Sequence, residues 1–401
     1  MALIATVVDD LTPEFLSEVL DCAGAVDRVT ATRIGTGQVA LSLRLDLQLA
    51  ADAPSDLPQV LVAKIPSPDA ESREAARMHL TYHKEVGFYL DLSDDAPPDL
   101  PQVLVAKIPS PDAESREAAR MHLTYHKEVG FYRDLAGVVS VPHPTVRYAV
   151  IDAASGDFTL LMHQAHGDVG DQLAGCSVSD AEAMVDAAVG LHAPTWGKVE
   201  ELANTSWLPM PDPAGVSQRQ AIYSMLLPGF IDRFQHRLAN DVLDAARWLG
   251  EHLSALTLTS KLPLCVVHGD YRLDNMLFER SETASAVTVL DWQTTGFGRG
   301  PTDIAYGIGS GLLLDDRRTE EASLVERYVN GLTAAGIDCS SDDVMHDYRV
   351  GTVSGLGMAV IASQVVTATE RGDEMFAVMA ERHAQQMIDN DVFALLDGGS
   401  K

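Results

Sequence analysis

Residues 268–275 read HGDYRLDN, and two short apolar segments follow them, MLFE and VTVL, which flank the polar turn RSETASA and lead into DWQ at residues 291–293. Two apolar segments joined by a polar turn predict a β-hairpin. Asp270 and Asn275 stand five residues apart before this hairpin, and Asp291 follows directly after it. The hairpin is thus framed by a carboxylate and an amide on one side and by a second carboxylate on the other.

This spacing matches the needs of phosphoryl transfer. Such a site needs a carboxylate that accepts the proton of an attacking hydroxyl, and an amide oxygen and a second carboxylate that hold Mg²⁺ at the terminal phosphate. Asp270 and Asn275 have the spacing of the kinase catalytic loop H-x-D-x-x-x-x-N, and Asp291 follows where a kinase places its metal-binding D-x-x element. We therefore predict that Asp270 is the catalytic base and that Asn275 and Asp291 bind the metal. A merely polar turn would explain each residue alone, but not their joint spacing.

The neighbours of Asp270 have less certain roles. His268 could be mistaken for the base, because the pKa of a free histidine is near neutral. We expect it instead to brace the loop, with Asp303 of the segment GRGPTDIAY holding the loop by hydrogen bonds. Arg272 and Asp274 have two open interpretations, contact with the substrate or shaping of the loop.

The composition is that of an ordinary globular protein with an unusual charge. The chain has 401 residues, 46% of them hydrophobic, and a mean hydropathy of +0.01, which suffices for two or three domains or lobes with a groove for a ligand. Its 29 Lys and Arg against 58 Asp and Glu leave a net charge of −29, which repels nucleic-acid backbones and anionic lipid. We expect no nucleic-acid or membrane partner. An acidic surface would suit a cationic substrate or simply keep the protein soluble.

The chain ends and the cysteines favour a cytoplasmic location. The N-terminus, MALIATVVDD, lacks the basic region and the apolar run of a secretion signal. The most apolar stretch, 351–367, contains Ser and Gln and is better explained as a buried helix than as a membrane span. The four cysteines form no metal-binding or disulfide pattern.

A tandem repeat interrupts the first half of the chain. Residues 47–89 recur at 90–132 with four differences in 43 aligned positions. One near-identical copy is unlike a solenoid, which needs several divergent copies. We interpret it as a recent duplication or a fault of assembly, and expect that the fold needs one copy.

Each copy carries a lysine inside an apolar strand, VLVAKI, followed by a helix with the sequence HKEV. A buried ammonium needs an acidic partner, and a Lys–Glu pair that orients the α- and β-phosphates is the expected solution. The copies offer Lys64 with Glu85 and Lys107 with Glu128. We expect one pair to function, and favour the second because its unit continues directly into the next strand.

A glycine-containing loop lies upstream. Gly35, Thr36, Gly37 and Gln38 stand between two predicted strands, where glycine lets the backbone approach phosphates closely. A tight hairpin would explain the two glycines equally well. A phosphate-binding role is favoured only because the same chain also contains the HGD loop.

The overall pattern predicts an α+β fold with two parts. Residues 1–165 should form a small antiparallel sheet with the glycine loop and the duplicated strand–helix unit. Residues 166–401 should be mainly helical and contain the catalytic loop and the substrate pocket. The predicted helices of this part cover 179–192, 217–238, 240–256, 319–335, 342–367 and 374–396.

The motifs resemble those of the aminoglycoside phosphotransferase and choline kinase superfamily. HGDYRLDNMLF (268–278), LDWQTTGFGRGPTDIAY (290–306) and ERGDEMF (370–376) carry the similarity, which covers most of the chain. DWQ points to the bacterial relatives of ecdysteroid kinase-like proteins. The resemblance implies a protein-kinase-like two-lobed fold and transfer of the γ-phosphate of ATP, with Mg²⁺, to a small-molecule hydroxyl.

Two departures from the family pattern are visible. The repeat is not a family feature, and Met162, His163 and Gln164 stand where relatives usually have an acidic pair at the inter-lobe hinge. The resemblance implies that adenine binds to backbone groups of this hinge. The replacement of the acidic pair therefore leaves open which nucleotide donates the phosphate.

Two other functions compete with a small-molecule kinase of unspecified acceptor. The first is an aminoglycoside-type resistance kinase, which the negative charge would suit; the second is a catalytically silent nucleotide-binding protein, if the extra copy distorts the small lobe. The acceptor and the oligomeric state stay open, because the expected pocket regions, 205–235 and 340–375, contain no decisive constellation. Their large aromatic residues are better explained as core: Trp207, Tyr223, Phe230 and Tyr348.

Overall fold

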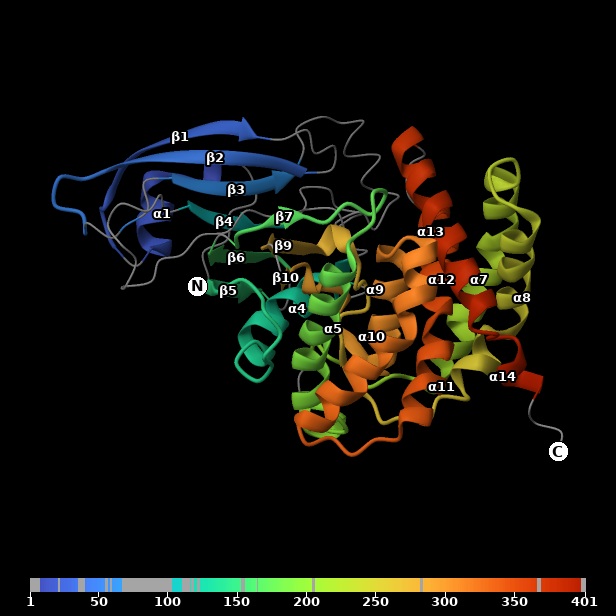
Figure 1. Ribbon diagram of the computed structural model, residues 1–401. Coiled ribbons are helices and arrows are strands. Elements are labelled where there is room, and N and C mark those ends of the chain that lie inside the picture. Colours follow the sequence, from blue (N-terminus) through green and yellow to red (C-terminus); the bar gives the residue numbers. More distant parts are fainter. Residues whose placement is uncertain are drawn as a thin grey trace. The chain divides into compact units, whose positions relative to one another are not determined.

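The structure is a computed structural model (Figure 1). It describes residues 8–20, 22–34, 40–54, 57, 60–66, 103–109, 116, 119–120, 123–152, 156–163, 165–203, 206–281, 284–365 and 369–397. The chain divides into two compact units. The first, here called the sheet unit, comprises Met1–Gly137, His143–His166 and Leu290–Gln293; the second, the helical unit, comprises Val138–Pro142, Gly167–Val289 and Thr294–Lys401.

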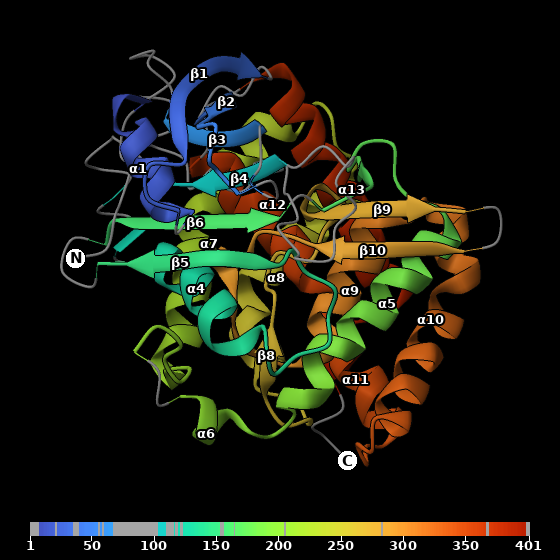
Figure 2. The ribbon, with the colours of Figure 1, turned by 90° about the vertical axis from the view of Figure 1, so that its left-hand side faces the viewer.

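The described part of the sheet unit is built on one sheet of six strands, in the order β1-β2-β3-β4-β6-β5. Figure 2 shows β5 and β6 running side by side at one edge of this sheet. Their bounds are β1 (Val26–Ile34), β2 (Ala40–Leu49), β3 (Val60–Pro66), β4 (Val103–Lys107), β5 (Val146–Ile151) and β6 (Phe158–His163). The neighbours pair antiparallel, with one exception between β3 and β4.

The exception is the pair formed by the two copies of the repeat. β3 and β4 carry the same sequence, VLVAK, and pair in parallel and in register, so that Lys64 lies opposite Lys107. Both copies therefore contribute a strand to the sheet. The sequence analysis did not foresee this pair, because it expected that the fold needs only one copy of the repeat.

Two described helices of the sheet unit lie before β1 and between β4 and β5 along the chain. α1 (Pro13–Val19) begins after Thr12, whose hydroxyl accepts a hydrogen bond from the backbone N–H of Phe15 at 3.1 Å. This capping and the proline at the first helical position agree with the predicted helix start. α4 (Thr124–Gly130) continues directly into a π-helical turn, η3 (Phe131–Leu135). Single π turns inside helices frequently occur at functional sites.

The helical unit contains most of the helices and two small sheets, ordered β10-β9-β7 and β11-β8. The predicted hairpin is confirmed: β9 pairs antiparallel with β10. The strands are β7 (Asp168–Val169), β8 (Cys265–Val267), β9 (Met276–Arg280), β10 (Ser285–Val289) and β11 (Gly296–Gly298). The helices are α5 (Val178–His192), α6 (Val199–Leu202), α7 (Pro213–Phe234), α8 (Asn240–Thr257), α9 (Gly300–Gly311), α10 (Leu314–Ala334), α11 (Ser341–Gly351), α12 (Val353–Val365), α13 (Glu370–Asp389) and α14 (Ala394–Asp397). The fold class is therefore α+β, as predicted.

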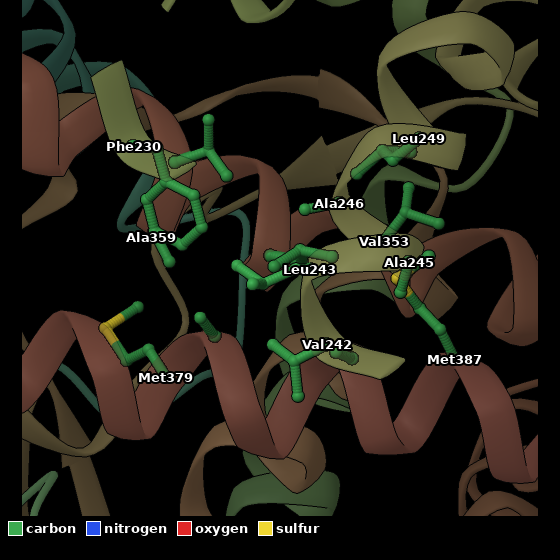
Figure 3. Close-up of a cluster of buried hydrophobic side chains, with 14 of the residues drawn as sticks. Phe230, Val242, Leu243, Ala245, Ala246, Leu249, Val353, Ala359, Met379 and Met387 are labelled. Atoms are coloured by element: carbon green, nitrogen blue, oxygen red, sulfur yellow. The ribbon is translucent and has the colours of Figure 1, made fainter. Parts of the chain in front are cut away.

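A hydrophobic core joins four of these helices. Figure 3 shows its side chains, which come from α7 (Phe230), α8 (Val242, Leu243, Ala245, Ala246, Leu249), α12 (Val353, Ala359) and α13 (Met379, Met387). The aromatic residues expected in the core are buried, with Tyr223 and Phe230 inside this cluster and Trp207 and Tyr348 elsewhere in the unit. They therefore fill the interior, as predicted.

Three helix predictions need correction. The single helix expected over 342–367 is two helices that meet at Thr352, whose hydroxyl donates to the Arg349 carbonyl at 2.7 Å. The helix expected over 374–396 ends at Asp389. α9 was not predicted, because its sequence GPTDIAYGIGSG is rich in glycine, a poor helix former. Its almost complete burial stabilises it in spite of this composition.

Among the described residues, no helix has both the length and the apolar character needed to cross a membrane. The four cysteines are free thiols; Cys265 is buried and the others are half-buried.

Candidate active site

The catalytic loop lies in the helical unit, between β8 and β9. The carboxylate of Asp270 accepts hydrogen bonds from Asn275 Nδ2 at 2.9 Å, from Arg272 Nε at 3.0 Å and from the Tyr306 hydroxyl at 3.0 Å. All four side chains are buried. The structure thus joins the predicted base and the predicted amide ligand, and adds two donors that the sequence analysis did not assign to this carboxylate.

The backbone of the loop is braced as predicted. Asp303 accepts the backbone N–H of His268 at 2.6 Å and that of Gly269 at 3.0 Å, and also contacts His192 Nε2 at 3.2 Å. His268 Nδ1 accepts the backbone N–H of Asp270 at 3.2 Å. The bracing expected of His268 and Asp303 is therefore confirmed: both residues hold the turn that contains Asp270, the predicted base.

The backbone conformation at Gly269 requires glycine. Its φ is 82°, in the left-handed region, and a β-carbon there would lie 2.9 Å from the Thr294 carbonyl oxygen. Glycine alone meets both demands without strain.

Arg272 shapes the loop. Its guanidinium bonds to Asp270 and, through Nη1, to Asp274 Oδ2 at 2.9 Å. Burial works against the charge of Arg272, but the two carboxylates outweigh burial and raise the pKa of the guanidinium above its ordinary value. Of the two interpretations of Arg272 and Asp274, the structure supports an ion-paired loop.

A second set of predicted residues meets inside the sheet unit. Lys107 Nζ lies 2.5 Å from Glu128 Oε1 and 3.5 Å from Asp291 Oδ1, and the three side chains are buried. Lys64 is in β3, but its side chain lies outside the described residues, as does Glu85. The pair that the sequence analysis favoured, Lys107 with Glu128, is thus in contact, and the choice between the two pairs stays a prediction.

Asp291 is held in an unusual backbone conformation. Its φ is 62°, a left-handed value that Asp and Asn tolerate better than other non-glycine residues. The next residue, Trp292, stacks on Phe131 of η3 with ring centroids 3.6 Å apart and an interplanar angle of 4°. Gln293 Nε2 donates to Asp291 Oδ2 at 3.1 Å. The stacking therefore fixes the DWQ segment to the helix that carries Glu128.

The other predicted nucleotide-binding residues are only partly described. Gly35, Thr36, Gly37, Gln38 and Gln164 lie outside the described residues. Met162 and His163 form the end of β6 and are buried; the N–H of His163 donates to the Thr145 carbonyl at 2.8 Å.

The donor set fits Mg²⁺. Asp291 Oδ1 is buried and accepts no hydrogen bond from the described residues. Asn275 Nδ2 donates hydrogen bonds to the carbonyl and carboxylate oxygens of Asp270, and these two bonds do not use its amide oxygen. Carboxylate and amide oxygens are the ligands that Mg²⁺ prefers. Within the described ranges no three His, Cys, Asp or Glu side chains cluster as a metal site.

The comparison with known families now decides the relationship. The family model of the phosphotransferase enzyme family matches residues 91–339, more than half of the chain. The chain belongs to this family. The match begins inside the second copy of the repeat, so it includes Lys107 and Glu128 and omits Lys64 and Glu85.

Solved structures resemble this phosphotransferase at low sequence identity. The ethanolamine kinase of Plasmodium vivax is 10% identical with a TM-score of 0.46, and the match covers 90% of this chain and 82% of that one. The choline kinase of Cryptosporidium parvum is 8% identical with a TM-score of 0.46, covering 92% and 91%. An ADP-bound aminoglycoside phosphotransferase is 11% identical with a TM-score of 0.44, covering 93% and 97%.

Among curated proteins, acyl-CoA dehydrogenase family member 11 of Mus musculus is 45% identical to this phosphotransferase over 42 residues. The match spans 10% of this chain and only 5% of that protein.

The family's protein-kinase-like organisation is visible in this phosphotransferase. One unit is a sheet with the Lys–Glu pair, and the other is mainly helical with the HGD loop. Two site residues escaped the sequence analysis, Tyr306 and Trp292. The signal for Tyr306 was present: it stands three residues after Asp303 and so on the same face of α9.

Proposed function

We propose that this protein is an ATP- and Mg²⁺-dependent phosphotransferase that phosphorylates a hydroxyl of a small molecule, with Asp270 as the base. The observation that carries the proposal is the buried contact of Lys107 with both Glu128 and Asp291. Burial of an ammonium between two carboxylates costs free energy of desolvation. A functional role for Lys107 would explain why the protein keeps this arrangement. Orientation of nucleotide phosphates by Lys107, itself oriented by Glu128, provides such a role.

The helical unit supplies the proton acceptor. Asp270 accepts the proton of the acceptor hydroxyl as its oxygen attacks the γ-phosphorus of ATP, and ADP is the leaving group. Arg272 and Asn275 hold the carboxylate by hydrogen bonds. His268 and Asp303 keep the loop backbone in place, so that the base is preorganised before substrate binds.

The sheet unit supplies the charges for the nucleotide. Lys107 neutralises the α- and β-phosphates. Asp291 and Asn275 would hold Mg²⁺, which when bound offsets the negative charge of the β- and γ-phosphates. DWQ further favours the ecdysteroid kinase-like branch within the proposal, and the cytoplasm, which contains ATP, is the proposed location.

The first test is turnover. Purified protein with Mg·ATP is offered alcohols, sterols, amino sugars and choline, and ADP formation and the phosphorylated product are measured. Wild-type protein should phosphorylate at least one hydroxyl acceptor. Asp270→Asn should lose about 10²–10⁴-fold in kcat, because a positioned general base contributes about that much, while it retains Mg·ATP binding.

The matched control is Asp241→Asn, which removes a carboxylate near the start of α8 that bonds the backbone N–H of Val242. It should leave turnover unchanged. If Asp270→Asn keeps more than a tenth of wild-type turnover, Asp270 is not the base; if the wild type phosphorylates no acceptor, the proposed function is wrong.

A further inference from the structure

The base Asp270 contacts a tyrosine that comes from another part of the fold. The hydroxyl of Tyr306, in α9, donates to Asp270 Oδ1 at 3.0 Å, and both side chains are only 2% exposed. Arg272 and Asn275 also bond this carboxylate, but they belong to the same loop as Asp270 and move with it. Tyr306 instead ties the carboxylate to the helical core.

α9 holds the loop at two points. Asp303 accepts the backbone N–H groups of His268 and Gly269, and Tyr306 stands three residues later. Residues three apart share one face of a helix. One face of α9 therefore fixes both the backbone of the loop and the carboxylate of the base.

Tyr306 is itself fixed from behind. Its ring lies 5.3 Å from the ring of His383 in α13, centroid to centroid. His383 is completely buried and packs so closely on Gly355 of α12 that a β-carbon would find no room there. Gln386 contacts His383 Nδ1 at 3.3 Å and donates to the Ala305 carbonyl at 3.1 Å. The tyrosine has little freedom to leave the carboxylate.

The hydroxyl of Tyr306 remains a donor at any working pH. Burial, and after it the negative charge of Asp270, raise the pKa of Tyr306 well above its ordinary value. The other charged groups near it are Arg272, which lowers this pKa, and Asp274, which raises it. Tyr306 therefore cannot compete with Asp270 as a base.

We propose that Tyr306 is a positioning residue of the phosphoryl-transfer reaction: its hydroxyl holds the Asp270 carboxylate in one orientation. This inference rests on the proposed function. The acceptor proton passes to Asp270, and Tyr306 keeps its own proton throughout. Loss of the hydrogen bond from Tyr306 should let the Asp270 side chain turn away from the acceptor hydroxyl.

The test compares Tyr306→Phe with Tyr223→Phe. Tyr223 is equally buried, and its hydroxyl donates to the Ala246 carbonyl at 2.9 Å, away from the catalytic loop. Tyr306→Phe should lower kcat about tenfold to a hundredfold, the range for a lost charge-assisted bond or a misplaced group. KM for ATP should stay within about twofold. Tyr223→Phe should show none of these changes.

A second measurement does not depend on turnover. In protein labelled with ¹³C at the aspartate carboxyls, the NMR signal of Asp270 is assigned by its absence in Asp270→Asn and is recorded at one fixed pH. The signal should shift or broaden in Tyr306→Phe, because the carboxylate loses one hydrogen bond and its fixed orientation, and it should stay in Tyr223→Phe. Should Tyr306→Phe unfold, 3-fluorotyrosine at position 306 keeps the ring and makes the hydroxyl a stronger donor, which should shift the same signal without broadening it.

The outcomes separate the inference from the proposed function. If the enzyme turns over and Tyr306→Phe equals Tyr223→Phe in kcat and in the Asp270 carboxyl signal, the inference is overturned and the function stands. If the wild type phosphorylates no acceptor, the proposed function fails and the catalytic role of Tyr306 fails with it.

Discussion

Asp291 combines a strained backbone with a buried charge. A non-glycine residue in the left-handed region costs about 1–3 kcal/mol, and such residues cluster at functional sites. Asp291 has a φ of 62°, and the ring of the next residue, Trp292, is stacked on Phe131. In this conformation Asp291 Oδ1 lies 3.5 Å from Lys107 Nζ.

Asp291→Asn should therefore abolish Mg²⁺-dependent nucleotide binding without unfolding the protein. Asn tolerates the left-handed region as Asp does, but it lacks the negative charge that binds the metal. Because loss of a residue that merely supports a metal ligand costs about 10–100-fold in affinity, we expect Mg·ATP affinity to fall by at least about a hundredfold. Calorimetric titration measures the affinity, and the exposed Asp244→Asn is the control. Wild-type affinity in Asp291→Asn would refute the metal-binding role.

At this scale the sequence predicts the residues that are linked by short spacing. Asp270, Asn275 and the bracing pair His268 and Asp303 were found from motif spacing, and the structure shows their hydrogen bonds. Tyr306 was missed although it stands three residues after Asp303. Because α9 itself was not predicted, the sequence analysis had no helix face on which to place the two residues together.

At the scale of elements, the contact of α12 with α13 contains a buried histidine. His383 of α13 is completely buried against Gly355 of α12, and Nδ1 contacts Gln386 Oε1 at 3.3 Å. Burial, assisted by Arg382 and Arg317, lowers the pKa of His383 to about 3. The imidazole is therefore neutral in the folded protein at every pH in which the enzyme would work.

His383 should make the helical unit sensitive to acid. Its pKa is lower in the folded than in the unfolded state, so the unfolded state binds more protons and stability falls as pH falls below about 6.5. Between pH 7.5 and 5 this amounts to about 2 kcal/mol. His383→Asn retains a donor toward Gln386. Its free energy of unfolding, measured with urea, should fall by about 2 kcal/mol less than that of the wild type between pH 7.5 and 5.

The control for this prediction is the exposed His236, changed to Asn in the same way. It should leave the pH dependence of unfolding as in the wild type. Equal pH dependence in His383→Asn and the wild type would mean that His383 is not buried as a neutral group.

Element boundaries were harder to predict than element types. The hairpin of β9 and β10 was found because alternating apolar segments flank a polar turn. The division of the helix at Thr352 was not predicted, because the apolar pattern continues through this position. In the structure, Gly351 lies so close to α9 that a β-carbon would meet Thr302 and Ala305. α9 was also missed, because glycine has a low helix propensity. Its glycines permit close contacts that stabilise the helix through packing.

At the scale of the molecule, both copies of the repeat contribute a strand to the same sheet. β3 pairs antiparallel with β2, and β4 pairs antiparallel with β6. The two identical strands pair in parallel with each other, with Lys64 opposite Lys107. A single VLVAK strand has the correct direction for both outer neighbours. The sequence revealed the repeat but could not show this, because strand identity does not determine which neighbours pair.

Removal of either copy should leave a folded and active enzyme. In a chain that lacks 47–89 or 90–132, one VLVAK strand can pair with β2 on one side and with β6 on the other, giving an antiparallel sheet with one strand fewer. The two shortened chains differ at only the four positions where the copies differ. Their thermal unfolding and ATP turnover should therefore be nearly identical, and each chain serves as the control of the other.

The shortened chains also identify the working lysine. In the full chain, Lys107→Ala should lower kcat by more than about a hundredfold, since the loss of one preorganised charge costs that much, while Lys64→Ala should have little effect. In the chain that lacks 90–132, Lys64 is the only VLVAK lysine left and Glu85 its partner in sequence, so Lys64→Ala should now be the inactivating change. Half activity in each full-length variant would mean that the copies exchange places in the sheet. Unfolding of both shortened chains would mean that the fold requires both copies of the repeat, contrary to this prediction.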